Sequence, residues 1–215
     1  MDRLIPYSAD VYRTIIVDHN LSLWPLQIFI VIICISLIGL ARRGGANNTA
    51  FVIVSTFWIW CGFDFHLSTY ATINWAAQYF GYAFIAQGGA IIIWALLTRN
   101  QFIEPHRQRW SWVGIILIIS AAIMHPLMLF FSGAPLGYAE IPGMMPTPTA
   151  LVTIGLMYLI PRRLVFWLLL VPVFWAIWDG LSAWSLGLNA GLVLPCITVV
   201  AALSLIMCLR SPASR

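Results

Sequence analysis

Apolar residues fill seven stretches of the chain, and nearly all of the charged side chains lie outside these stretches. A helix that crosses a lipid bilayer needs about 20 apolar residues, and all but the fifth stretch come close to that length. We therefore predict an all-α integral membrane protein built as a bundle of seven transmembrane helices. The predicted spans are 23–41, 50–69, 73–98, 111–131, 147–160, 164–184 and 190–209.

The fifth span is predicted to be short. Thr147-Pro148 matches an N-cap followed by proline at the first helical position, and another proline ends the run. A helix of roughly 13 residues is about 20 Å long, whereas the hydrocarbon core is about 30 Å thick. Either the preceding loop 132–146, which contains Glu140, folds into the membrane with the free N–H groups of the helix facing a cavity, or the span begins upstream at Ile141.

The segment before the first span is predicted to be a helix at residues 8–20, which either lies on the membrane surface or is an ordered lead-in to the first span. Its apolar face carries Val11, Tyr12, Ile15 and Ile16. The expected organisation is an N-terminal interfacial helix in 1–22, one seven-span domain in 23–210 and a cytoplasmic tail in 211–215.

The basic residues predict the orientation of the bundle. The chain is 61% hydrophobic and 8% charged, and its 11 basic residues are all arginine. One side of a seven-span arrangement carries nine of them: Arg42, Arg43, Arg99, Arg107, Arg109, Arg162, Arg163, Arg210 and Arg215. Because cytoplasmic loops are enriched in basic residues, the N-terminus is predicted to lie outside and the C-terminus in the cytoplasm. The net charge of +4 then reflects topology, so the expected partner is the lipid bilayer and not nucleic acid.

Polar residues inside the spans gather towards the outer end of the predicted bundle, where they are Asp64, His66, Asn74, Gln78, His125 and Asp179. An ionisable group within a span costs about 2.5–3.5 kcal/mol on insertion scales, so such groups usually face the interior and have partners. Together with the fifth helix and its loop, they predict a ligand site formed by Asp64, Asn74, Gln78, His125, Glu140, Thr147 and Asp179. The alternative is a polar helix end that contacts water. Asp64 and His66 are about 200° apart on a regular helix, so they cannot both face one ligand.

His125 lies next to a predicted kink. Pro126 has no N–H and leaves the carbonyl of Ala122 without its helical partner. Gly114, Ala121 and Ala122 make one side of this helix small, so a neighbour can approach closely. The imidazole is therefore either a ligand-facing or metal-facing group, or a packed side chain that satisfies a neighbouring helix.

Three segments carry a resemblance to a known family: Asn20…Trp24-Pro25…Gln27, Ile73-Asn74-Trp75-Ala76-Ala77…Phe80-Gly81…Gln87 and Gly143-Met144-Met145-Pro146-Thr147-Pro148-Thr149…Gly155. With them the chain resembles an uncharacterised family of bacterial multi-pass membrane proteins, defined only as a domain of unknown function. The resemblance implies the bacterial inner membrane and a polar site at the outer ends of spans one, three and five. Similar proteins often carry Cys-Pro-Thr where this chain has Thr147-Pro148-Thr149, so thiol chemistry is not expected there.

Several function classes are excluded by what the sequence lacks. The chain has no lysine for a retinal Schiff base, and it has no H-E-x-x-H, G-x-S-x-G or P-loop motif. No catalytic motif is present, so an enzyme is not favoured. The leading hypothesis is a protein that binds or transports a small solute or ion in the outer half of the bundle. The second is an accessory or structural subunit of a larger membrane complex, with other membrane subunits as partners.

The third hypothesis is a cofactor protein. His66 and His125 lie at similar depth on different helices, as two axial ligands of a haem would. Alternatively, a copper site could form, because thioether sulfur favours Cu(I). The candidate copper ligands are His125, Met124, Met128, Met144 and Met145.

Overall fold

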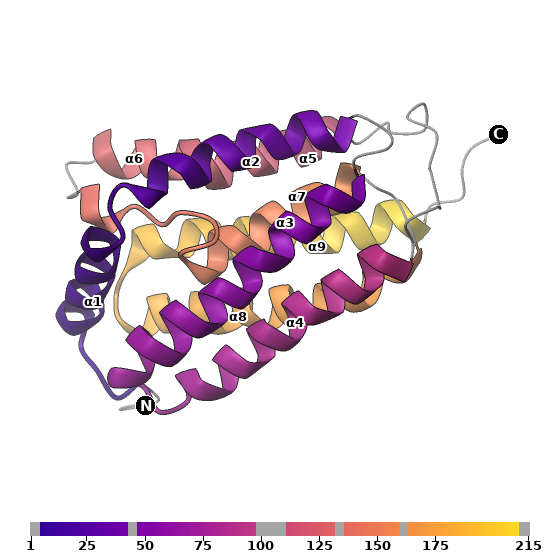
Figure 1. Cartoon of the computed structure of the whole chain (residues 1–215). Coiled ribbons are helices and arrows are strands. Elements are labelled where there is room, and N and C mark those ends of the chain that lie inside the picture. The colour runs from indigo at the N-terminus through magenta and orange to yellow at the C-terminus, as the bar shows by residue number, and fades with distance from the viewer. Residues whose placement is uncertain (1–4, 43–46, 98–110, 132–135, 160–162, 211–215) are drawn as a thin grey trace.

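The computed structural model describes residues 5–42, 47–97, 111–131, 136–159 and 163–210, and helices dominate them. The α-helices are α1 Ala9–Ser22, α2 Leu26–Arg42, α3 Asn47–Trp60, α4 Ala77–Leu97, α5 Ser111–Ile119, α6 His125–Phe131, α7 Pro146–Leu159, α8 Leu170–Ser185 and α9 Val193–Arg210. Helix α1 lies across one end of the bundle formed by the others, and it meets α2 at 84° (Figure 1). We call this end the α1 end.

Short π-helical and 3₁₀ segments lengthen or join several helices. The π-helix Cys61–Thr69 and the 3₁₀ turn Tyr70–Thr72 continue α3, and the π-helix Ser120–Met124 joins α5 to α6. The 3₁₀ helices Arg163–Leu169 and Asn189–Leu192 precede α8 and α9. The second π-helix lies beside the proline of the predicted kink, where a missing N–H is accommodated by a locally wider turn.

Among the residues that the structure describes, five helical segments are long and apolar enough to cross a membrane: Asn48–Thr72, Ala77–Leu97, Ser111–Met128, Phe166–Ser185 and Asn189–Met207. A sixth span results if α1 and α2 are taken together as one bent pair. Helix α7, with 14 residues, falls short of a span. The described residues of the seven predicted segments are thus mainly helical, but their length and composition support five or six spans where the sequence predicts seven.

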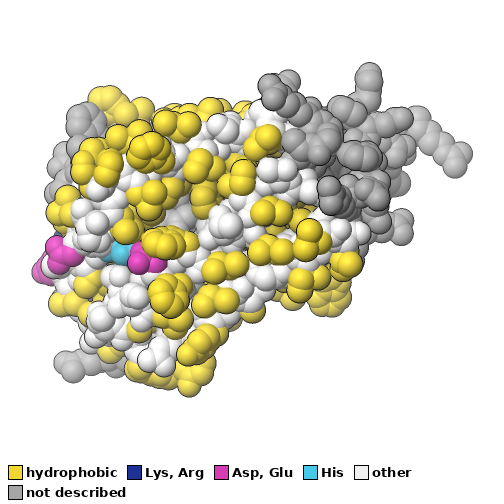
Figure 2. Space-filling model, viewed as in Figure 1, with side chains coloured by type: hydrophobic (Ala, Val, Ile, Leu, Met, Phe, Trp, Pro, Cys, Tyr) yellow, Lys and Arg dark blue, Asp and Glu magenta, His cyan; other side chains and the backbone are white. Residues whose placement is uncertain are grey.

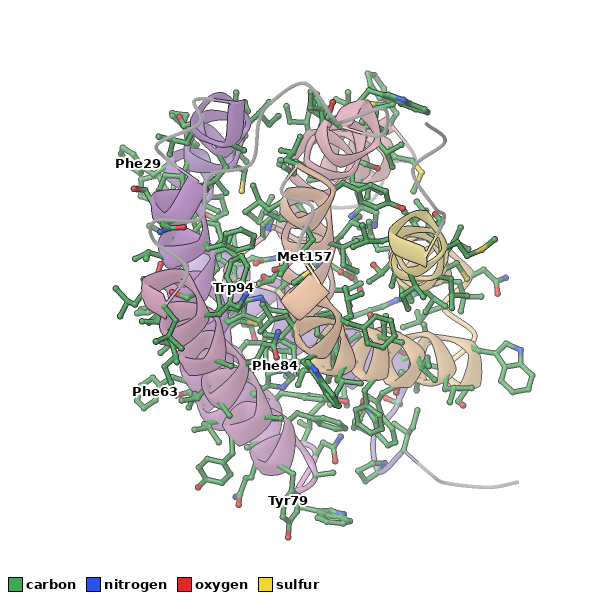
Figure 3. All side chains as sticks on the ribbon, turned by 90° about the vertical axis from the view of Figure 1, so that its right-hand side faces the viewer. Phe29, Phe63, Tyr79, Phe84, Trp94 and Met157 are labelled. Carbon is green, nitrogen blue, oxygen red and sulfur yellow. The ribbon has the colours of Figure 1, made fainter. Side chains whose placement is uncertain are left out.

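The surface of the bundle is strongly apolar. Hydrophobic side chains are spread over the described part of the face seen in Figure 2, and acidic and histidine side chains gather at the α1 end. In the end view of Figure 3, Phe29, Phe63 and Tyr79 point away from the bundle; they are 60%, 61% and 68% exposed. Continuous apolar surface of this kind is far larger than soluble monomers expose, so it fits contact with lipid.

Helix α7 lies at the centre of the bundle, and all 14 of its residues are buried. It packs against α3, α5, α8 and α9, and Met157 lies in the middle of the end view (Figure 3). Residues 141–145, which precede it, are buried and not helical, so the alternative of a span that starts at Ile141 is wrong. Because protein surrounds α7 on every side, its length need not match the thickness of a bilayer.

Two pairs of glycines allow helices to approach backbone to backbone. A Cβ on Gly114 of α5 would lie 2.4 Å from the carbonyl oxygen of Gly155 in α7. A Cβ on Gly62 would lie 2.8 Å from the carbonyl oxygen of Gly81 in α4. Small residues at such crossings are typical of helices that associate in membranes, and the first pair confirms the predicted small side of the fourth span.

Candidate functional site

A partly enclosed cavity of about 370 Å³ lies at the α1 end. Its walls come from α1, α6, the segment before α7, the last turns of α8 and the 3₁₀ helix Asn189–Leu192. Small-molecule sites have volumes of roughly 300–1,000 Å³, so the cavity suits a small solute. The wall is mainly apolar, and its ionisable side chains are Tyr12, Arg13, His125, Tyr138, Glu140 and Asp179.

Asp179 is held in this wall by the first turn of α7. The Thr147 hydroxyl donates a hydrogen bond to Oδ2 of Asp179, and Nε1 of Trp175 donates to the same hydroxyl at 2.9 Å. Thr147 and Trp175 are buried. The predicted role of Thr147 as the N-cap is wrong, because α7 begins at Pro146 and the hydroxyl contacts Asp179 instead of the helix backbone.

The start of α7 offers fewer free donors than the sequence predicts. Pro146 and Pro148 have no backbone N–H, and the N–H of Thr149 donates to the carbonyl of Met145 at 3.4 Å. The prediction that free N–H groups of this helix face the cavity therefore fails for most of its first turn. What α7 contributes to the site is the Thr147 side chain.

Glu140 lies in the segment that leads into α7, and it is partly buried. No described residue donates a hydrogen bond to its carboxyl group. Burial, and to a smaller extent the nearby charge of Asp179, raises the pKa of Glu140 to about 8. Glu140 therefore holds a proton at neutral pH while the cavity is empty.

His125 reaches the cavity from the first residue of α6. Its backbone N–H bonds to the carbonyl of Ser120 across the π-helix, which turns α6 relative to α5. The side chain is 6% exposed, and its Nδ1 has no hydrogen-bond partner among the described residues. An unpaired buried imidazole nitrogen costs about 1–3 kcal/mol, so the wall of the cavity contains an unsatisfied polar group.

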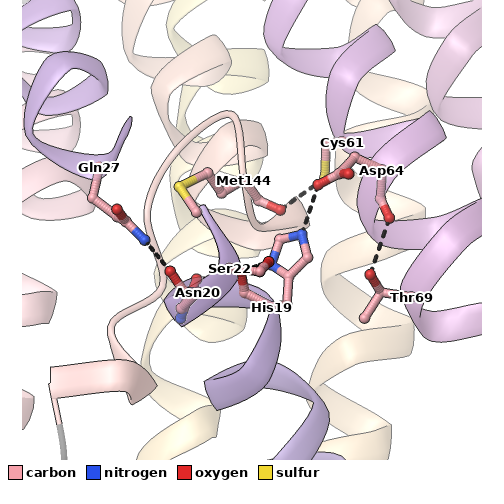
Figure 4. Close-up of polar contacts among 8 residues, drawn as sticks. All are labelled: His19, Asn20, Ser22, Gln27, Cys61, Asp64, Thr69 and Met144. Atoms are coloured by element: carbon pink, nitrogen blue, oxygen red, sulfur yellow. Dashed lines mark hydrogen bonds and ion pairs between the residues drawn. The ribbon is translucent and has the colours of Figure 1, made fainter. Parts of the chain in front are cut away.

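Helix α1 is fixed across the cavity by contacts at both of its ends. Tyr7, just before the helix, shares a hydrogen bond with the Tyr70 hydroxyl. At the other end, Nε2 of His19 lies 2.8 Å from Oδ2 of Asp64 (Figure 4). The Asn20 amide donates to the carbonyls of Gly137 and Ala139 at 2.6 and 3.0 Å. These contacts make α1 a fixed wall of the cavity.

Comparison with known proteins assigns the chain to a family. A model of the family of unknown function DUF6064 matches residues 9–213, which include α1 and the whole bundle. The chain belongs to DUF6064. This confirms the resemblance to a domain of unknown function. No curated protein and no solved structure matches the chain.

Three predicted site residues of this DUF6064 chain lie at the α1 end but do not line the cavity. Asp64 bonds to His19, as described above. The side-chain oxygen of Asn74 accepts the N–H of Ala76 at 3.0 Å and so shapes the turn before α4. Gln78 is exposed. The cavity thus brings together His125, Glu140 and Asp179, with Thr147 behind Asp179.

His66 and His125 are not brought to one place. His66 is fully buried in an aromatic cluster, it does not line the cavity, and neither ring nitrogen has a hydrogen-bond partner among the described residues. Its nearest ring neighbours are Phe84 and Trp175, with centroids 4.5 and 4.7 Å away. Asp64 and His66 point in different directions even though the helix here is a π-helix.

The part of this DUF6064 chain that the structure describes contains no group of three or more His, Cys, Asp or Glu residues that could hold a metal ion. The sulfur ligands proposed for copper are also divided. Met144 and Met145 are buried, whereas Met124 and Met128 are 54% and 42% exposed on the outer surface. The structure thus brings together neither the two candidate haem ligands nor the candidate copper ligands.

Sequence reasoning missed five polar residues of the cavity: Tyr12, Arg13, Tyr138, Ser182 and Asn189. The pattern of α1 did place Tyr12 and Ile16 on one face, but that face was assigned to the membrane surface. In the DUF6064 structure it packs against the bundle. The apolar face of a short helix next to a span can be buried either by lipid or by protein, so the same pattern is also compatible with packing against the bundle.

Proposed function

We propose that this protein is a multi-pass membrane protein of the bacterial inner membrane that binds a small polar solute in the cavity at the α1 end. One observation carries the proposal. In a bundle whose surface and core are apolar, His125, Glu140 and Asp179 line a single partly enclosed cavity of about 370 Å³. Buried ionisable groups within a membrane bundle are costly and typically belong to a functional site.

The arginine pattern supports an outward-facing cavity. Helices α2 and α9 end at Arg42 and Arg210, and both of these ends lie away from α1 (Figure 1). If the arginine-rich end is cytoplasmic, the α1 end and its cavity face the extracytoplasmic side.

Binding is better supported than conduction through the bundle. Gln87, the buried amide in the middle of α4, donates to the carbonyl of Leu168 at 2.7 Å, so it already has a structural partner. The other polar groups in the core around α7 are mainly hydroxyls bonded within the protein, such as Thr153 with Trp58 Nε1 at 2.8 Å, and the buried imidazole of His66 is enclosed by aromatic rings. A carrier would have to rearrange these contacts, whereas a receptor or binding subunit would not.

The test is a thermal-unfolding screen of the purified protein in detergent against small amines, carboxylates, polyols and neutral amides. A ligand present at 100 times its dissociation constant stabilises the folded state by about 2.7 kcal/mol, which shifts the melting temperature measurably. We expect one class to stabilise the wild type and to lose this effect in Asp179→Asn. Asp18→Asn, which changes an exposed carboxylate on α1 outside the cavity, is the matched control. A screen in which no class shifts the wild type contradicts the proposal.

A further inference from the structure

The charges in the cavity favour one class of ligand. Two carboxyl groups line the cavity. Among the described residues that line it, Arg13 is the one arginine, and there is no lysine. The Arg13 guanidinium lies at the rim, where Nη1 is 3.6 Å from Oδ1 of Asp10. The side chains of Arg13 and Asp10 are 49% and 91% exposed, so this ion pair faces solvent. The interior therefore carries acidic groups without a cation to neutralise them.

The remaining wall fits a short apolar body. Ile16, Ala183 and Leu186 line the cavity beside the rings of Tyr12 and Tyr138. A cation near the face of a tyrosine ring gains about 0.5–2 kcal/mol when it is partly desolvated. A ligand with one ammonium group and a few carbon atoms would satisfy both the acidic and the apolar parts of this wall.

His125 supplies an independent observation. Its side chain lines the cavity and is 6% exposed, and its Nδ1 lacks a partner in the described part of the chain. A neutral imidazole nitrogen accepts a hydrogen bond, and an ammonium group has three N–H donors to give. Two carboxyl groups and one imidazole can therefore surround the head of a primary amine.

We propose that the cavity binds a small primary amine as its ammonium ion, and that each amine displaces the proton of Glu140. This inference rests on the proposed function. In the exchange the ammonium ion enters, the Glu140 O–H bond breaks and the proton leaves to solvent, so the charge of the site is unchanged. Keeping the proton on Glu140 beside Asp179 in the empty cavity avoids placing two adjacent carboxylates in an apolar wall.

Other titratable groups surround Glu140. They are Asp179 on α8, His125 on α6, Tyr12 and Arg13 on α1, and Tyr138 on its own segment. Burial is the largest cause that raises the pKa of Tyr138, and it does the same for Tyr12, so both phenols stay neutral near pH 7. Glu140 is thus the group outside the spans that gains or loses a proton when the local charge changes.

The experiment is calorimetric titration of the detergent-solubilised full chain with n-butylammonium at about pH 7, in phosphate and in HEPES. The difference between the two heats gives the protons released. We expect release of about one proton per bound amine. Glu140→Gln should still bind the amine but release none, and Asp179→Asn should weaken binding by about tenfold or more because a charged hydrogen bond is lost. Asp18→Asn should match the wild type in both respects.

1-Butanol and butyrate serve as neutral and anionic probes of the same size. If one of them binds and n-butylammonium does not, the proposal of an amine ligand is overturned, whereas the proposed binding of a small solute is retained. If n-butylammonium binds in the wild type without buffer-dependent heat, the exchange with Glu140 is overturned. If none of the three binds and the thermal screen is also empty, both this inference and the proposed function fail.

Discussion

Replacing Gly114 by alanine is expected to destabilise the folded bundle by about 3 kcal/mol, the upper end of the usual range for overpacking. The new Cβ would lie 2.4 Å from the carbonyl oxygen of Gly155 and 3.0 Å from Cβ of Tyr158. A backbone oxygen cannot rotate away as a flexible side chain can, so α5 must move off α7. Because α7 also packs against α3, α8 and α9, that shift disturbs the whole core.

Equilibrium unfolding of the variant in detergent micelles measures this effect. The matched control is Gly89→Ala in α4, where a Cβ would have no atom within 4 Å. Alanine is favoured over glycine in a helix by about 1 kcal/mol, so the control should be neutral or slightly stabilised. Equal stability of the two variants would contradict the close crossing of α5 and α7.

Replacing Thr147 by valine is expected to cost about 3 kcal/mol, because the change leaves two buried polar groups without a partner at 1–3 kcal/mol each. Valine keeps the shape of threonine but has no hydroxyl. The Trp175 indole N–H would lose its acceptor and Asp179 its donor. The variant should also bind a ligand of the cavity more weakly, since Asp179 would no longer be held in place.

Two substitutions make this test specific. Thr147→Ser keeps the hydroxyl and should restore most of the stability and the binding. Thr56→Val removes an exposed threonine hydroxyl that bonds to the carbonyl of Ile53 within α3, and it should change stability by less than about 0.5 kcal/mol. If Thr147→Val unfolds at the same denaturant concentration as Thr56→Val, the link from α7 to Asp179 does not contribute to stability.

The helices could be predicted from the sequence because apolar runs are bounded by arginines and turn residues. The predicted span 164–184 corresponds to Arg163–Leu169 followed by Leu170–Ser185, and 190–209 corresponds to Asn189–Leu192 followed by Val193–Arg210. The short fifth helix was also predicted, since prolines bound its run. These features depend on local composition, which a sequence states directly.

The central position of α7 could not be predicted from its pattern. Lipid and protein cores are both apolar, so a helix enclosed by other helices looks like one that faces lipid. The exceptions are its hydroxyl-bearing residues, Thr147, Thr149 and Thr153, which are spread along its length and bond inside the bundle. Small polar residues of this kind are the available signal of enclosure by protein.

The members of the site could be predicted only in part. Glu140 and Thr147 were predicted because they lie in the loop before the short fifth helix or at its start, and His125 and Asp179 because they are polar at one depth of an apolar chain. Asp64 was predicted by the same rule, yet it bonds to His19 on α1, 45 residues away. Depth along a helix follows from sequence position, whereas the direction of a side chain and its partner depend on packing between distant segments.

The acidity and outward opening of the cavity are tested most directly by thiol labelling of Ser182→Cys in intact cells. Ser182 lines the cavity wall on α8, and the wild type reports any reaction of the native cysteines. Two impermeant methanethiosulfonates of similar size, one with trimethylammonium and one with sulfonate, are compared, with rates normalised to a free thiol in buffer. We predict labelling from outside with a cationic preference of about tenfold or more, which falls towards one in Glu140→Gln combined with Asp179→Asn. Equal rates for both reagents, or no labelling from outside, would contradict an acidic cavity that faces the extracytoplasmic side.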